Sequence, residues 1–216
     1  MSARWMVAVA LALTGGALLA GGARADAPAS VVVNGGLEDW QDAPAALQQA
    51  VSCPQLPGGW NLNPGLVGKQ FSLARDAEVK HGGESSARLA NPDTTSAVSL
   101  LQRLSVEPEM RYVVRMWLRG EKVDAYHPKG VIVTLVSSSQ NDPRDNNMWA
   151  GSLAVADKAP SPNQGTFDWR ELVGIVDTPP GTKSLMLVVT LRGAGTMWVD
   201  DVQVTPLEKC IEVESY

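Results

Sequence analysis

Two adjacent aspartates, Asp200 and Asp201, stand in the middle of the segment GTMWVDDVQVTP, which otherwise alternates like a β-strand. Strand interiors are depleted in aspartate, and a buried carboxylate needs a partner. Because side chains alternate between the two faces of a strand, Asp200 shares a face with Val202 and Val204, and Asp201 takes the other face. We therefore predict that Asp200 points into the core and that Asp201 is a solvated surface acid or a residue at the rim of a binding face. The partner of Asp200 would be an arginine, a set of backbone amides or a hard cation.

Two other segments contain oxygen atoms that suit such a cation. VVVNGGLEDW places Glu38 after a Gly-Gly turn, and VKHGGESSARL places a second glycine turn, with free carbonyls, ahead of a strand. Calcium takes six to eight carboxylate and carbonyl oxygens at about 2.3–2.6 Å. Because first and last strands commonly pair in a jelly roll, Glu38 and Asp200 could meet there.

The segment RYVVRMWLRG (111–120) suggests a sugar-binding face. Its alternation places Trp117 between Arg115 and Arg119, opposite an apolar face. An indole stacks on a pyranose ring, and guanidinium groups donate to hydroxyls or to a uronate. The alternative is that the long connection 138–166 covers Trp117 and makes it part of a second small core.

Several loop residues suit the rim of such a face. Tyr126 in DAYHP and Trp149 in NNMWAG are aromatic residues in polar surroundings. Amide side chains that could bind hydroxyls follow one another in the same connection: Gln140, Asn146 and Asn147. Trp60 and Trp169 are expected to pack under loops, since a half-buried tryptophan is common.

Enzymatic alternatives rest on fewer residues. A polysaccharide lyase would use Tyr126, His127 and Arg115, and a glycoside hydrolase would need two positioned carboxylates, of which no pair is recognisable. No G-x-S-x-G or Cys-His nucleophile pattern occurs. We therefore expect a binding protein rather than an enzyme. A surface or matrix module that binds another protein remains a third possibility.

The elements that would hold these residues are β-strands. Nine short alternating or apolar runs are separated by turn sequences, and this pattern favours an all-β jelly-roll sandwich. The runs are 31–34, 70–79, 86–91, 97–106, 111–120, 131–138, 167–176, 183–193 and 196–205. Residues 45–51 suggest one or two helical turns, and residues 149–156 an extra strand in the long connection.

The N-terminal segment, the net charge and the cysteines predict the compartment and the kinds of partner. Residues 1–25 have an early cation, an apolar run and an A-x-A site, which predict a signal peptide followed by one domain over residues 26–216. The protein is therefore expected to be secreted, periplasmic or extracellular. A net charge of −5 with interspersed signs indicates neither nucleic acid nor membrane insertion, and we expect a monomer. In an oxidising compartment the two cysteines, Cys53 and Cys210, are expected to form a disulfide.

The ordered motifs resemble a known family. An opening NGGLE, a tryptophan some twenty residues later, an HGG turn before a small-residue strand, YVVRMWLRG, FDW and a closing WVDDV are similar to carbohydrate-binding modules of the CenC type. These are galactose-binding-like jelly rolls attached to xylanases and glucanases. The resemblance implies binding of a polysaccharide or oligosaccharide and a structural calcium. Its ligands would be the side chains of Glu38 and Asp200 and carbonyls from around Gly36 and from His81 to Glu84. The cysteine-bearing insertion Gln41 to Gly59 departs from the family.

Overall fold

The computed structural model describes residues 28–50, 53–62, 71–124, 130–138, 148–153 and 164–209. The elements are β1 (Trp40–Asp42), α1 (Ala45–Ala50), β2 (Gln55–Pro57), β3 (Asn61–Leu62), β4 (Ser72–Asp76), β5 (Ser86–Asn91), β6 (Ala97–Ser105), β7 (Met110–Asp124), β8 (Val131–Ser138), β9 (Met148–Leu153), β10 (Gly165–Asp177), β11 (Ser184–Arg192) and β12 (Ala194–Lys209). None of the helical residues so described forms a segment with the length and apolarity needed to cross a membrane.

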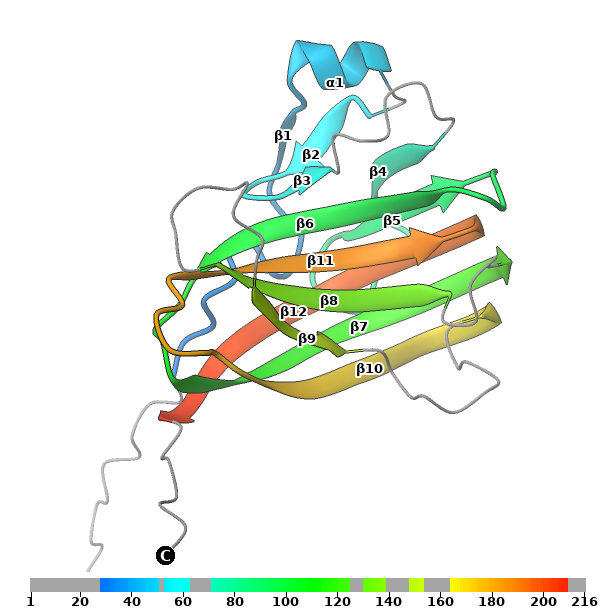
Figure 1. Ribbon diagram of the computed structural model, residues 1–216. Coiled ribbons are helices and arrows are strands. Elements are labelled where there is room, and N and C mark those ends of the chain that lie inside the picture. The colour runs from blue at the N-terminus through cyan, green and yellow to red at the C-terminus, as the bar shows by residue number, and fades with distance from the viewer. Residues whose placement is uncertain are drawn as a thin grey trace, which may run out of the picture.

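Ten of these strands form two antiparallel five-stranded sheets (Figure 1). We call β10-β7-β12-β5-β4 the first sheet and β3-β6-β11-β8-β9 the second sheet. β1 and β2 pair with each other in a separate two-stranded sheet beside α1. The predicted all-β sandwich is confirmed, and so is the short helix expected near residue 45.

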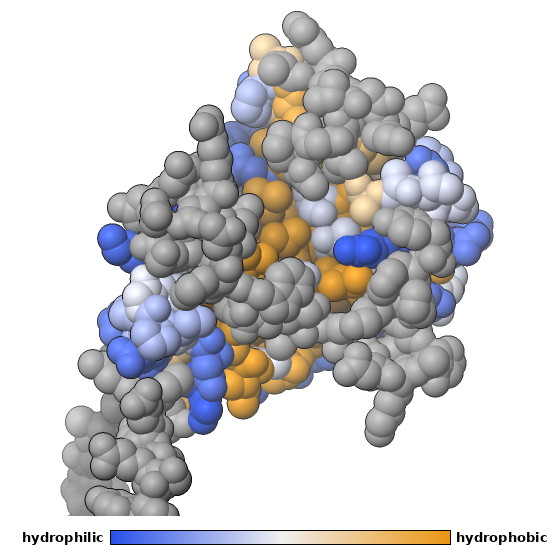
Figure 2. All heavy atoms as spheres, in the orientation of Figure 1, coloured by the Kyte–Doolittle hydropathy of each residue, from blue (hydrophilic) through white to orange (hydrophobic). Residues whose placement is uncertain are grey.

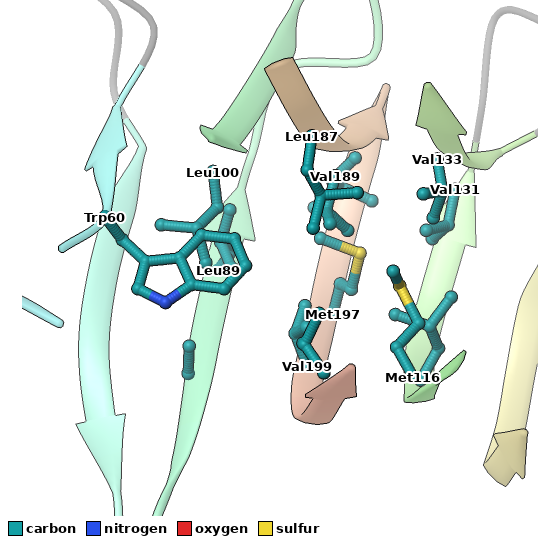
Figure 3. Close-up of a cluster of buried hydrophobic side chains, with 14 of the residues drawn as sticks. Trp60, Leu89, Leu100, Met116, Val131, Val133, Leu187, Val189, Met197 and Val199 are labelled. Atoms are coloured by element: carbon teal, nitrogen blue, oxygen red, sulfur yellow. The ribbon is translucent and has the colours of Figure 1, made fainter. Parts of the chain in front are cut away.

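The core lies between the two sheets because each strand alternates apolar and other residues. In β7, Val114, Met116 and Leu118 are buried, and in β11 Leu187 and Val189 are fully buried. Figure 3 shows side chains from both sheets meeting in this layer, with Trp60 at one side of it. The second set of side chains on each strand therefore faces away from the core, and these outer faces carry the candidate sites.

The N-terminal segment departs from the prediction. Residues 31–34 were expected to be a strand, but they lead into a turn in which Asn34 and Leu37 have positive φ. Two backbone hydrogen bonds nevertheless hold this segment beside β12, from Val31 N to Val204 O (2.8 Å) and from Val202 N to Gly35 O (2.8 Å). The expected proximity of the two ends of the domain is therefore observed, although without a strand. The extra strand expected in the long connection is observed as β9.

Cys53 carries a free thiol in the structure, instead of the predicted bond to Cys210. Its Sγ donates a hydrogen bond to the carbonyl of Gln55 (3.2 Å), and burial raises the pKa of this thiol to about 11. The disulfide was expected because the protein was predicted to enter an oxidising compartment. Residues 31–35 do lie beside β12, but the chain then runs into β1, α1 and β2, and Figure 1 places β1 and β2 at the far end of the molecule from the end of β12. Cys210 itself lies outside the described residues.

Candidate functional site

A β-bulge in β12 reverses the predicted orientation of Asp200. Asp201 has φ of +48°, and the pairing with β7 shifts between Asp200 and Gln203. The extra residue places both Val199 and Val202 in the core, although they are three positions apart. Asp200 is paired with Trp117 and therefore lies on the outer face of the first sheet. The prediction that it shares the core face of Val202 is wrong.

Asp200 is nevertheless fully buried, because the β4–β5 loop (residues 77–85) folds over it. Its Oδ2 accepts hydrogen bonds from the backbone N–H groups of His81 (2.8 Å) and Gly82 (3.1 Å), and its Oδ1 accepts one from Asp201 (2.8 Å). Burial raises the pKa of Asp200 above its usual value, and these three donors offset part of that rise. The structure thus shows the backbone-amide alternative for Asp200, and this carboxylate positions the loop.

Glu38 holds the same loop from the other side. Its Oε1 accepts the backbone N–H of Glu84 (2.8 Å), and its Oε2 accepts the hydroxyl of Ser85 (3.1 Å). Gly83 has φ of +54°, and a Cβ there would collide with Glu38 Oε1, so the turn requires glycine. Glu38 and Asp200 therefore both accept hydrogen bonds from residues 81–85, and these are the three segments whose meeting the resemblance implied.

These residues agree only in part with a calcium site. Among the described residues, no group of three or more His, Cys, Asp or Glu side chains could hold a metal. The loop presents amide donors, rather than carbonyl oxygens, to Asp200. A calcium ion would therefore need Glu38 and backbone carbonyls, including those near Gly36, for most of its ligands.

His81 covers the tryptophan that was expected to bind sugar. Its ring stacks on Trp117 with centroids 3.8 Å apart and planes 13° apart, and it meets Trp169 edge-on at 5.8 Å. Its Nδ1 lies 2.6 Å from Oδ2 of Asp201, which is therefore a partner of the loop and is not simply solvated. One ring face of Trp117 is therefore occupied by the protein itself. This cover comes from the β4–β5 loop, whereas most of the connection 138–166, which the sequence suggested as the cover, lies outside the described residues.

The arginines on either side of Trp117 also have partners. Arg115 lies 2.8 Å from Glu171, and Arg119 lies 4.0 Å from Asp168. Arg119 also lies over the ring of Trp198, 5.5 Å from its centroid. The outer face of the first sheet is thus a network of paired charges and covered aromatics. Trp60 is buried, as expected, whereas Trp169 joins the His81 cluster.

The other predicted rim residues cannot be placed. Tyr126, His127, Gln140, Asn146 and Asn147 lie outside the described residues. Trp149 is in β9, where its backbone is the partner of Val136 in β8.

The outer face of the second sheet was missed by sequence reasoning. Half-buried apolar side chains lie beside hydroxyl groups across its central strands, and Ser99 and Thr190 bond to each other at 2.9 Å. Figure 2 shows hydrophobic residues open to view along the middle of this face. Other members of this outer face, which register places in adjacent rows, include Leu101, Arg103, Thr134, Val136, Met186, Val188 and Arg192. The strands β3, β6, β8, β9 and β11 contain no aspartate or glutamate, which is the sequence signal that could have identified the face.

Comparisons with known proteins agree with this fold. No family model and no curated protein matches the sequence. Among solved structures, the chain is similar to a carbohydrate-binding module described as "CBM4 structure and function", with a TM-score of 0.52, 15% identity, and coverage of 81% of this chain and 99% of that one. It is also similar to the enzymatically active domain of bacteriophage CBA120 tailspike protein 4 (TM-score 0.53, 12% identity) over 82% of this chain. The match spans 21% of the tailspike chain. The fold is therefore the predicted jelly-roll β-sandwich, a class that includes carbohydrate-binding modules.

Proposed function

We propose that this protein is a secreted, non-catalytic carbohydrate-binding protein whose ligand lies on the outer face of the second sheet. The jelly-roll fold and the ordered motifs similar to CenC-type modules support the class. The observation that carries the proposal is the composition of that face. Apolar side chains such as Met186 and Val188 suit the C–H faces of sugar rings, and Thr134, which is half-buried and in register with Val188, supplies a hydroxyl group beside them.

The second sheet suits a ligand better than the first. On the first sheet, the rings and guanidinium groups around Trp117 already have protein partners, so a sugar would have to displace them. On the second sheet, Leu101, Met186 and Val188 are half-buried, and none of the described strands packs over them. A partly exposed apolar sheet face with polar neighbours commonly marks an interaction site.

Affinity electrophoresis with soluble neutral and acidic polysaccharides tests the proposal. Wild-type protein should be retarded by at least one polysaccharide, without release of new reducing ends or unsaturated uronates. Met186→Ala and Val188→Ala should each weaken that retardation several-fold, because each removes apolar contact area. Ile175→Ala is the matched control, since Ile175 is 59% exposed on the outer face of the first sheet. No retardation by any polysaccharide would reject the function, and loss of binding only in Trp117→Ala would move the site to the first sheet.

A structural calcium remains part of the proposal. Glu38 and Asp200 would supply carboxylate ligands, and the ion would hold the N-terminal turn, the β4–β5 loop and β12 together. An ion that binds only the folded state stabilises by about 2.7 kcal/mol at a hundredfold excess over Kd. EDTA should therefore lower the Tm of wild type and leave that of Asp200→Ala unchanged. An equal Tm of wild type with and without EDTA would show that the amide bonds of Asp200 suffice.

A further inference from the structure

The two sheets differ in the sign of their charged residues and in how these residues are paired. Arginines on the first sheet are matched by nearby carboxylates, namely Arg75 with Glu84 (3.9 Å), Arg111 with Asp177 (2.8 Å) and Arg115 with Glu171 (2.8 Å). The strands of the second sheet carry two charged residues, Arg103 and Arg192, and no acidic ones. This excess of positive charge stands out because the whole chain has a net charge of −5.

Arg103 is on the outer face of β6, in register with Met186 of β11. Its Nη1 donates to the hydroxyl of Ser184 (2.7 Å), which fixes the direction of the guanidinium group. No carboxylate lies within ion-pair distance of it in the described part of the chain. A guanidinium group has five donors in a planar fork, so most of those of Arg103 remain available to a ligand.

Arg192 is at the end of β11, in register with Ala97, on the same outer face. Its Nε is buried and finds no hydrogen-bond acceptor among the described residues. A buried donor without an acceptor is destabilising, and such a group in a native structure calls for an explanation. An anionic group of a ligand would both accept this bond and neutralise the charge.

The spacing of the two arginines indicates an extended ligand. Arg103 is level with Met186, and Arg192 is six positions further along β11, which is about 20 Å at the usual rise of a strand. Between them lie the apolar and hydroxyl-bearing rows of the face. A single small anion could not reach both arginines, whereas a polymer with repeated acidic groups could.

We propose that the second sheet binds an acidic, carboxylate-bearing polysaccharide, with Arg103 and Arg192 each holding a uronate carboxylate. This inference rests on the proposed function, since it names the ligand class of that same face. Apolar contacts would position the sugar rings, and the two guanidinium groups would select acidic chains over neutral ones.

A matched pair of ligands tests the charge requirement. Wild-type protein is titrated calorimetrically with polygalacturonate and with the same polymer after reduction of its carboxyl groups. Polygalacturonate should bind at least tenfold more tightly. Its affinity should fall between about 20 and about 200 mM NaCl, because exposed charge pairs are screened by salt. Equal affinity for both polymers would overturn the inference while leaving carbohydrate binding intact.

Two variants and one control test the residues. Arg103→Gln and Arg192→Gln should each lower the affinity for polygalacturonate by about tenfold or more, the usual effect of losing a charge-assisted hydrogen bond. Arg111→Gln is the control, because Arg111 has the same side chain on the first sheet and is paired with Asp177. It should bind as wild type does. If the two variants bind unchanged, the inference fails.

The outcomes separate the inference from the proposed function. If neither polymer nor any neutral polysaccharide binds, the proposed function itself fails. If a neutral polysaccharide binds and Met186→Ala weakens it, the function holds and the acidic ligand class is wrong. If dextran sulfate binds but polygalacturonate does not, the carboxylate assignment is overturned in favour of a sulfated chain. Should either arginine variant be unfolded, the wild-type comparison of the two polymers still decides the question.

Discussion

At the scale of single residues, the backbone of Asp201 decides what Asp200 can do. Its left-handed conformation is one that aspartate tolerates better than most residues do. The resulting bulge moves Asp200 from the core face to the outer face of the first sheet, where three amide groups satisfy it. The two acidic residues in the strand signalled that something unusual occurs there. Strict alternation could not reveal it, because a bulge adds one residue without a glycine to mark it.

Trp117 is expected to act as a structural residue. Trp117→Ala should lower the free energy of unfolding by about 1–3 kcal/mol, because it removes the stacked pair with His81 and leaves space beneath the loop. Urea unfolding followed by circular dichroism measures this change. His81→Ala is the comparison, and it should cost less because the indole remains in place. Loss of glycan binding at an unchanged stability would instead make Trp117 a ligand platform.

Cys53 is expected to be an unreactive thiol in the native protein. Because its pKa is raised to about 11, little thiolate is present near neutral pH, and burial also blocks access. A thiol reagent should therefore modify Cys53 slowly at pH 8 and rapidly after unfolding in urea. If no thiol can be titrated after unfolding without reductant, Cys53 is disulfide-bonded and the earlier expectation is restored.

At the scale of elements, the strands were predictable and their partners were not. The alternation of RYVVRMWLRG correctly gave Tyr112, Val114 and Met116 as buried, because period-two burial is a local property. The loop that covers Trp117 could not be inferred, since His81 is 36 positions away in the sequence and its placement depends on Asp200. The meeting of Glu38 with the 81–85 turn was anticipated from the resemblance rather than from local pattern.

The start of β12 is expected to require glycine. Gly195 has φ of +127°, and a Cβ there would lie 2.7 Å from the carbonyl oxygen of Lys122. Gly195→Ala should therefore cost about 2–4 kcal/mol, from backbone strain together with a clash against main chain. Gly181→Ala is the matched control, because Gly181 also has positive φ (+77°) but no atom within 4 Å. It should cost about 1 kcal/mol, as measured by thermal unfolding. Equal costs would show that the neighbouring strand moves aside.

At the scale of the whole molecule, each of the last two strands is the middle strand of one sheet. β12 lies between β7 and β5, and β11 lies between β6 and β8. A chain that ends at Gly193 should therefore show no cooperative unfolding transition, because β5 and β7 would lose their shared neighbour. Differential scanning calorimetry beside the full-length protein tests this. A sharp transition in the shortened chain would mean that the second sheet holds the fold alone.

The central position of β11 and β12 also fixes when this protein can fold during its synthesis. Neither sheet can close until β11 and β12 (residues 184–209) have left the ribosome, and synthesis of 209 residues takes roughly 10–40 s at usual elongation rates. Until β11 and β12 emerge, β5, β6, β7 and β8 expose unpaired edges. The topology thus delays folding until late in synthesis, and the exposed strand edges make the nascent protein dependent on chaperones until then.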